Sequence, residues 1–525
     1  MARITKTYVI YPMMKGLDKE TIPGSQDPRS LKSCKNNIIN ARGSLKKAPG
    51  VRRIPYIGKE GGIQAAIHFF ATTGAGQASE IVRVRQGRVE IIRNESVVDM
   101  GIQVSETDTI VFERFQNALI IHFENTAPVY YTIGASALIN LGIFTSHQAS
   151  PPSFSRVHDF RLWYGGRGAA PHSLVVSAIN DIQDYSLLGG GFLMSIDSGD
   201  GDPKGLTGIS PTFKGDLYAF KWNSIHRIVR RDYGYSREKV SDEVGCVHHN
   251  TIISTQTDMF FVSPFAIHSL VSSDKYGSIE EASLTFPIYS YFQDNVNWSL
   301  AKNMIATYDK PSNSYLLSYA SGGSSVNDRV LGFNVKSKEF FEWNDIEYPA
   351  IGKYFDAGRQ KTLIGDNANG MGVLDSEYNT RFDQAIDFQA RTGIIYPLIN
   401  PKMVVNFTKA WVIAKPTSDD VNFTLNYFIN GDLRDSIEFN TYGEGVSFDG
   451  TQSKTVSQIQ VGTSVIGDAH KDSIILEAEL AGEGNAIEFE IIQEPDENDP
   501  DQSLEIYGIV FEYSYFEDQD TTAKI

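Results

Sequence analysis

The chain has 525 residues, of which 41% are hydrophobic and 21% are charged, and its formal net charge is −17. It has no run of about 18 apolar residues, which excludes a membrane-spanning helix, and its two cysteines exclude a disulfide framework. The acidic balance argues against general nucleic-acid binding through a basic face, because phosphate contacts need lysine and arginine. This argument does not exclude a channel through which DNA slides.

Residues 1–55 lack a strong period and are rich in turn-forming residues. The first 16 residues have no apolar core long enough for a signal peptide, so we expect the protein to be made and used in a cytoplasm, or carried out of one in an assembly. Fixing each backbone residue costs about 1–2 kcal/mol, so an extended arm of this kind must pack on its own propeller or on a neighbouring subunit. We predict an extended arm with interface residues in three apolar pairs: Ile10 and Tyr11, Met13 and Met14, Ile38 and Ile39.

Residues 56–390 are predicted to form an irregular β-propeller. Aromatic residues and glycines are plentiful, period-2 alternation recurs, and long stretches of period 3.6 are scarce. Strand pairs recur about every 40–55 residues, the period of a four-stranded propeller blade. We therefore expect five to seven blades. Seven strand pairs begin near Ile63, Thr109, Arg156, Thr212, Thr251, Met304 and Ile351.

Individual hairpins and one helical segment follow from local residue patterns. In the glycine-rich stretch from Asp159 to Ser186, we expect one strand at Arg161–Trp163 and the next at Ser173–Ala178. Arg161, Trp163 and Tyr164 fit a cation–π stack or a solvated blade edge, and we favour the edge. Residues 278–294 suggest helix, divided or kinked by Pro287. Turns are predicted at Trp222–Asn223, Ser263–Pro264 and Lys336–Lys338.

The pattern changes near Arg391, and residues 391–525 are predicted to form an antiparallel β-sandwich. This region holds about five to eight short alternating strands separated by polar turns. The expected domains are therefore 1–55 as the arm, 56–390 as the propeller and 391–525 as the sandwich.

Three polar motifs are candidates for metal or nucleotide sites. Cys246, His248 and His249 lack a second zinc-ligand pair, and two histidines adjacent on a strand point to opposite faces, so we favour ordinary strand residues over metal. The acids of Asp197–Asp202 do not match a calcium loop, which favours a polar turn. Gly74–Ser79 lacks the third glycine and the helix of a nucleotide loop. We predict no catalytic residues, no metal and no cofactor.

The order of several motifs resembles the tail hub and nozzle proteins of short-tailed bacteriophages, including the packaged-DNA stabilisation proteins. The segment YPMMKGLDKE, followed by SCKNNIINARGSLKKAPGVRRI, is similar to the beginning of those proteins. Further similar motifs follow in the same order up to Asp375, among them SLVVSAINDIQDYS, FKGDLYAFKWNSIHRI and YFDAGRQKTLIGDNANGMGVLD. The family's Asn and G-x-L-x-x-x-P-G turn match Asn37 or Asn40, then Gly43, Leu45, Pro49 and Gly50.

The resemblance implies a structural virion protein rather than an enzyme. Such proteins are similar in forming a hexameric ring below the portal and its adaptor, which continues the DNA channel, retains the packaged genome and allows its ejection. It implies a virion-tail location after assembly in the host cytoplasm. It also implies nearby needle, spike or fibre proteins, and genomic DNA passing without sequence-specific contacts.

Two other functions remain open. One is a propeller glycosidase or lyase acting on polysaccharide, because the many carboxylates could form a catalytic pair across a propeller funnel. The other is a cellular interaction scaffold built on a propeller. The resemblance and the missing catalytic signatures favour the tail protein.

Overall fold

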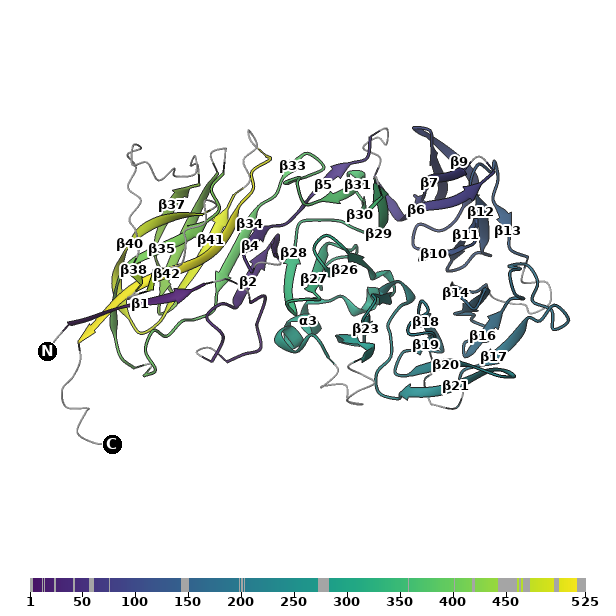
Figure 1. Cartoon of the computed structure of the whole chain (residues 1–525), viewed down its shortest axis with the longest axis horizontal. Coiled ribbons are helices and arrows are strands. Elements are labelled where there is room, and N and C mark those ends of the chain that lie inside the picture. Colours follow the sequence, from purple (N-terminus) through teal and green to yellow (C-terminus); the bar gives the residue numbers. More distant parts are fainter. Residues whose placement is uncertain are drawn as a thin grey trace. The chain divides into compact units, whose positions relative to one another are not determined.

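The computed structural model in Figure 1 is mainly β, with 56% strand and 5% helix. It describes residues 3–11, 13, 15–22, 25–40, 43–55, 61–74, 76–142, 151–197, 199, 202, 204–271, 283–356, 358–400, 402–417, 421–441, 460–461, 464–465, 473–494 and 500–516. Within these ranges no helix has the length and apolar character needed to cross a membrane. The chain divides into two compact units: unit 1 comprises 1–51, 332–344 and 376–525, and unit 2 comprises 52–331 and 345–375.

Unit 2 consists of successive antiparallel sheets whose strands follow one another along the chain. The first four sheets have four strands each. They are β6 (Ile63–Thr73), β7 (Gly76–Arg85), β8 (Arg88–Arg93) and β9 (Ser96–Gln103); β10 (Ile110–Phe115), β11 (Ala118–Phe123), β12 (Val129–Thr132) and β13 (Ile139–Asn140); β14 (Phe154–His158), β15 (Arg161–Gly165), β16 (Ser173–Val176) and β17 (Phe192–Ser195); and β18 (Leu206–Ile209), β19 (Leu217–Lys221), β20 (Ile225–Arg231) and β21 (Gly234–Ser241).

Three further groups of strands complete unit 2. They are β22 (Ile253–Ser254), β23 (Met259–Ser263) and β24 (Ala266–Ser269); β25 (Ile305–Asp309), β26 (Ser314–Tyr319) and the start of β27 (Arg329–Asn334), which continues into unit 1; and β29 (Ala350–Asp356), β30 (Arg359–Asp366) and β31 (Gly370–Asp375). The fifth sheet has three strands among the described residues rather than the four that we expected.

The first elements of neighbouring sheets contact one another in a closed cycle. The order is β6, β10, β14, β18, the 3-10 helix η2 (His249–Thr251), β25, β29 and again β6. The first and last sheets also share a hydrophobic core, in which Ile63 and Ala66 pack with Ala350 and Leu363. Unit 2 therefore returns on itself, and the burial of apolar side chains between its first and last sheets holds the two ends together.

Six of the seven predicted strand-pair starts lie close to the observed first strands, and the fourth differs more. The fourth sheet begins at Leu206 rather than near Thr212, because Phe213 and Asp216 form the turn of its first hairpin. The predicted turns at Trp222–Asn223, Ser263–Pro264 and Lys336–Lys338 are confirmed, since each lies between paired consecutive strands.

The helical prediction for residues 278–294 is confirmed from Phe286 onward, whereas the described residues 283–285 form a bridge and a bend rather than helix. The 3-10 helix η3 (Phe286–Ile288), with Pro287 in its first turn, leads into α3 (Tyr289–Asn295), and η4 (Trp298–Asn303) follows. Proline fits the first turn because its missing N–H has no partner there in any helix. The predicted capping residues, Ser278 and Glu281, lie outside the described residues.

Unit 1 contains two larger antiparallel sheets. In one, β3 (Asn37–Ile39), β4 (Leu45–Lys47), β42 (Glu505–Phe516), β35 (Val405–Ala414) and β40 (Ile474–Gly484) lie in this order, and β1 (Arg3–Ile10) also pairs with β42. The other has the order β2 (Leu31–Lys35), β34 (Phe388–Thr392), β41 (Ile487–Gln493), β36 (Asn422–Ile429) and β37 (Asp432–Asn440). Shorter strands are β5 (Gly50–Arg53), β28 (Glu339–Trp343), β32 (Thr380–Arg381), β33 (Gln384–Ala385), β38 (Gln460–Val461) and β39 (Ser464–Val465).

An aromatic core connects the two sheets of unit 1. Phe511 of β42 is fully buried, and its ring centroid lies 5.5 Å from that of Phe489 in β41 and 6.0 Å from that of Phe407 in β35. In β36, buried and partly exposed residues alternate, as expected for a strand with one face against a core. These contacts bury the apolar faces of both sheets.

The separate N-terminal arm is a wrong prediction. All eight residues of β1 pair with β42, from Arg3 opposite Phe516 to Ile10 opposite Ile509. β2, β3 and β4 also join the sheets of unit 1. The domain boundaries at 55 and 390 change accordingly, because the first 51 residues belong with the C-terminal sheets. Backbone pairing with a distant strand satisfies the N–H and C=O groups that an isolated arm would leave to water.

Candidate functional site

Four of the six predicted interface residues lie in the core rather than on an exposed interface. Ile10, Met13, Ile38 and Ile39 are at most 9% exposed, so they belong to the core of unit 1. Tyr11 is 47% exposed. Met14 lies outside the described residues. Four of the six residues are therefore buried, as apolar side chains require, but the surface that buries them is in the same chain.

Asn36 joins several segments of unit 1 and was not recognised as important from the sequence. Its backbone has φ of 54°, a left-handed conformation that asparagine tolerates. Its side-chain Oδ1 accepts hydrogen bonds from Asn344 N (2.9 Å) and Arg381 Nη2 (2.9 Å), and its Nδ2 donates to Asp387 Oδ1 (2.6 Å). Its N–H donates to Glu342 O. Asn36 is fully buried, so these bonds are made away from water.

Replacing this side chain is expected to destabilise unit 1. Asn36→Ala removes three buried hydrogen bonds, two of them to the charged Arg381 and Asp387, which should lower the free energy of unfolding by about 3 kcal/mol. The matched control is Asn94→Ala, because Asn94 has φ of 45° but is exposed, and its cost should stay below about 1 kcal/mol. Urea midpoints measure both. Equal midpoints for the two variants would show that the Asn36 network adds no stability.

The segment Cys246–Thr251 lies at the centre of unit 2. His249 stacks on Phe154, with ring centroids 4.8 Å apart, and its Nδ1 accepts a hydrogen bond from Ile209 N (3.2 Å). Asn250 Nδ2 donates to Ile110 O at 3.0 Å. These partners come from the third, fourth and second sheets respectively. One short turn therefore connects first strands of three different sheets.

The strand predicted for the two histidines is wrong. His249 begins the 3-10 helix η2, and the His248 side chain caps it by accepting a hydrogen bond from Asn250 N. The turn was missed because its stabilising contacts come from remote strands, and alternation alone cannot show a compact 3-10 turn. Across the described ranges, no cluster of three or more His, Cys, Asp or Glu side chains could hold a metal ion.

Burial keeps the titratable groups of this segment uncharged. It lowers the pKa of His248 to about 4 and that of His249 well below its ordinary value, and it raises the pKa of the Cys246 thiol to about 12. The thiolate is the nucleophilic form of cysteine, so Cys246 is unreactive at neutral pH. The segment is thus suited to joining sheets rather than to acid–base or nucleophilic chemistry.

Charged residues also connect neighbouring sheets near this centre. Arg156 Nη1 of β14 donates to Glu113 Oε2 of β10 at 2.8 Å, and Val157 N donates to Glu113 Oε1 at 3.0 Å. A further ion pair, between Lys302 Nζ of the 3-10 helix η4 and Glu124 Oε2 after β11, is 3.0 Å long and joins segments that are not neighbours in the cycle. The sequence did not identify the pair of Glu113 and Arg156, because the two residues lie on different strands and no local pattern joins them.

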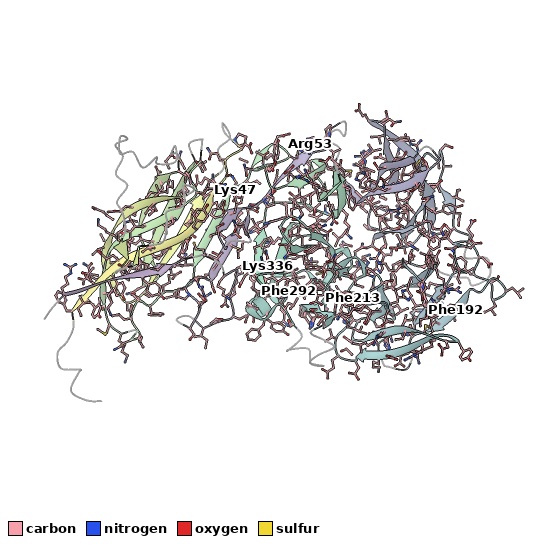
Figure 2. The ribbon with its side chains drawn as sticks, in the orientation of Figure 1. Lys47, Arg53, Phe192, Phe213, Phe292 and Lys336 are labelled. Atoms are coloured by element: carbon pink, nitrogen blue, oxygen red, sulfur yellow. The ribbon has the colours of Figure 1, made fainter. Side chains whose placement is uncertain are left out.

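Arg161 makes a different contact from those considered in the sequence. Trp163 and Tyr164 are fully buried, so the solvated-edge interpretation is wrong for them. The Arg161 guanidinium lies 5.7 Å from the ring centroid of Phe192, which Figure 2 labels, and it donates to the carbonyls of Ser177 (2.7 Å) and Gly190 (2.6 Å). Arg161 therefore ties the loop before β17 to the hairpin of β14 and β15.

The remaining motifs contribute to turns where they are described. Asp202 accepts hydrogen bonds from Asn223 N (2.9 Å) and Lys204 N (3.0 Å), so its carboxylate already has backbone partners. Parts of Asp197–Asp202 lie outside the described residues. Gly74 lies in the turn between β6 and β7 and Gly76 begins β7, so a strand follows where a nucleotide loop needs a helix.

Unit 1 has a cavity of about 200 Å³ near the β36–β37 turn. Glu488 is the one carboxylate of its lining, and it accepts a hydrogen bond from Arg391 Nε at 2.9 Å and pairs with Lys32 Nζ at 3.4 Å. Glycosidases generally use two carboxyl groups flanking the scissile bond. This cavity therefore lacks the pair that such an enzyme requires. The lining residues are Ile394, Tyr396, Asn430, Gly431, Asn485, Ala486, Ile487 and Glu488.

Comparisons with known proteins assign no family. No family model matches the chain, and no curated protein matches it in sequence. Among solved structures, it is similar to the extracellular domain of a putative one-component system, BT4673 from B. thetaiotaomicron, with 12% identity and a TM-score of 0.36 over 71% of this chain and 42% of that one. The chain thus covers less than half of that protein.

Two smaller structures are covered almost completely. The WD40 beta propeller domain of Doa1 has 9% identity and a TM-score of 0.38 over 63% of this chain and 96% of that one. YCF48 from Cyanidioschyzon merolae has 8% identity and a TM-score of 0.34 over 62% of this chain and 97% of that one. Scores this low support no argument about function.

Proposed function

We propose that unit 2 is a closed seven-bladed β-propeller and that unit 1 is an antiparallel β-sandwich completed by the N-terminal strands. The closed cycle of contacts from β6 to β29 and back supports the propeller. The contact between Phe489 and Phe511, which come from different sheets, supports the sandwich. Propellers and sandwiches are rigid platforms that present loops and edges to partners.

We further propose that the protein is a structural component of a bacteriophage tail. It would form a hexameric ring below the portal and adaptor, continue the DNA channel, retain the packaged genome and allow its ejection. The ordered resemblance from Pro12 to Asp375 indicates this family. The structural observation that favours a scaffold over an enzyme is the use of His249, Asn250 and Arg156 in contacts that join sheets.

Charge is compatible with this role. A net charge of −17 allows acidic side chains to line a ring, and such a lining repels phosphate so that DNA does not adhere. A ring forms when each subunit makes the same head-to-tail contact with the next one and the rotation between subunits closes.

The assembly state of the purified protein tests the tail proposal. We expect closed rings in negative-stain images and a mass of six times the 58.3 kDa protomer. A monomer that releases reducing ends from polysaccharide would instead support the glycosidase or lyase. A monomer without such activity, found outside virions, would support the cellular scaffold.

A further inference from the structure

The cavity near the β36–β37 turn is bounded by three segments of unit 1 that hydrogen bonds tie together. Ile487 N donates to Ile395 O at 3.0 Å, and Ile395 N donates to Ile487 O at 2.9 Å. Asn430 Oδ1 accepts hydrogen bonds from the N–H groups of Asn485 and Ala486, both at 3.1 Å. The walls of the cavity are therefore fixed before any ligand binds, which lowers the entropy cost of binding.

The β36–β37 turn leaves one side of the cavity open. Asn430 has φ of 55° and Gly431 has φ of 89°, as a two-residue hairpin turn with two positive φ angles requires. A Cβ atom at Gly431 would meet no atom within 4 Å, so open space lies beside this residue. The volume of about 200 Å³ is below the roughly 300–1,000 Å³ of drug-sized pockets. The cavity therefore suits one small molecule.

Three side chains bring unused hydrogen-bonding groups to this cavity. Glu488 is 2% exposed, and its Oε2 accepts hydrogen bonds from Arg391 and Lys32. Its Oε1 accepts none from the described residues and is not sealed inside the protein. Within the same ranges, the Tyr396 hydroxyl and Asn430 Nδ2 also have no hydrogen-bond partner. The lining thus offers an acceptor, a donor and a hydroxyl that can act as either.

The charges at the cavity favour a neutral ligand. Glu488 is the one charged residue of the lining, and the cations Arg391 and Lys32 already pair with it. A further cation would be repelled by both, and an anion would meet the free carboxylate oxygen. A molecule with several hydroxyl groups avoids both costs, because each hydroxyl donates one hydrogen bond and accepts others. Ile394 and Ala486 add apolar surface for its C–H groups.

We propose that this cavity binds a single neutral sugar ring. Hydroxyl groups of the sugar donate to Glu488 Oε1 and accept from Asn430 Nδ2, and its C–H face packs on the ring of Tyr396. One carboxylate is too few for glycoside hydrolysis, so the site binds the sugar without cleaving it. The site does not depend on the tail proposal, because unit 1 of one protomer contains all of its residues.

The test is a saturation-transfer NMR titration of the full-length protein at pH 7 with the methyl glycosides of glucose, galactose and mannose and with N-acetylglucosamine. We expect saturable binding of at least one sugar, with a Kd on the order of 1–10 mM. Tyr396→Ala removes the ring and should weaken binding about tenfold. Asn430→Asp should weaken it similarly, because aspartate keeps the acceptor for Asn485 and Ala486 but replaces the donor. Urea midpoints equal to that of the wild type verify that both variants fold.

Tyr11→Ala and Asn94→Asp are the matched controls. Tyr11 is a 47% exposed tyrosine of unit 1 outside the cavity lining, and Asn94 is an exposed asparagine with φ of 45° in the β8–β9 turn. Both controls should bind the sugar as the wild type does. No binding of any of the four sugars up to about 50 mM, or unchanged affinity in either lining variant, would overturn the proposal. Equal losses in the controls and the lining variants would also contradict it, because the effect would then not arise at the cavity.

Discussion

Removing residues 1–28 is expected to unfold unit 1. The deletion takes away β1, which pairs with β42 over its whole length, and the buried Ile10, Met13 and Leu17. It also exposes Phe511, because Tyr8 stacks on that ring at 5.2 Å. Each lost buried side chain costs roughly 2–5 kcal/mol, so the sum equals or exceeds the usual stability of a domain. Limited proteolysis should then cleave unit 1 in the deleted protein.

Adjacent substitutions separate this explanation from an exposed-arm role. Ile10→Ala should lower the free energy of unfolding by about 2–5 kcal/mol, because Ile10 is fully buried. Tyr11→Ala should cost about 1 kcal/mol or less, because Tyr11 is 47% exposed. Urea midpoints give both values. If instead Ile10→Ala unfolds like the wild type while Tyr11→Ala loses assembly, the segment serves an interface rather than the core.

Acid is expected to destabilise the protein strongly between pH 6.5 and pH 5. His122, His249 and His268 are fully buried. Burial lowers the pKa of His122 and His268 to about 4 and that of His249 well below its ordinary value. In the unfolded chain a histidine has a pKa of about 6.5, so below that pH the unfolded state binds protons that the folded state does not. The stabilisation is therefore complete above pH 6.5 and is lost as the pH falls.

The expected slope is large. Each histidine contributes up to about 1.4 kcal/mol per pH unit, so these three alone give roughly 4 kcal/mol per unit, and His248, whose pKa burial lowers to about 4, adds to this slope. Urea midpoints at pH 7.5, 6.5, 5.5 and 5.0 measure this slope before most carboxylates titrate. A stability that stays constant over this range would contradict the prediction.

His268→Phe provides a matched variant. The ring of His268 lies 5.9 Å from that of Phe261 and nearly parallel to it, and neither ring nitrogen has a hydrogen-bond partner among the described residues. Phenylalanine keeps the ring and removes the proton site. The slope should fall by about 1.4 kcal/mol per pH unit, with stability at pH 7.5 changed by less than about 1.5 kcal/mol.

The residues that sequence patterns interpreted correctly are those whose structure depends on near neighbours. Alternation in Leu217–Lys221 and the turn at Trp222–Asn223 define a hairpin, because side-chain period and turn chemistry act over a few residues. The same local signals placed six of the seven strand-pair starts and the helical segment around Pro287. They also identified Ile10, Met13, Ile38 and Ile39 as side chains that need burial.

The tertiary structure decided what those local elements contact. The strand of Ile10 pairs with that of Ile509, and Asn36 binds Arg381 and Asp387, yet no local pattern specifies either partner. The turn at His249 became a 3-10 helix because Phe154 and Ile209 meet it from other sheets. A strand edge offers the same N–H and C=O groups to any partner, so which segment satisfies them depends on the packing of the whole unit.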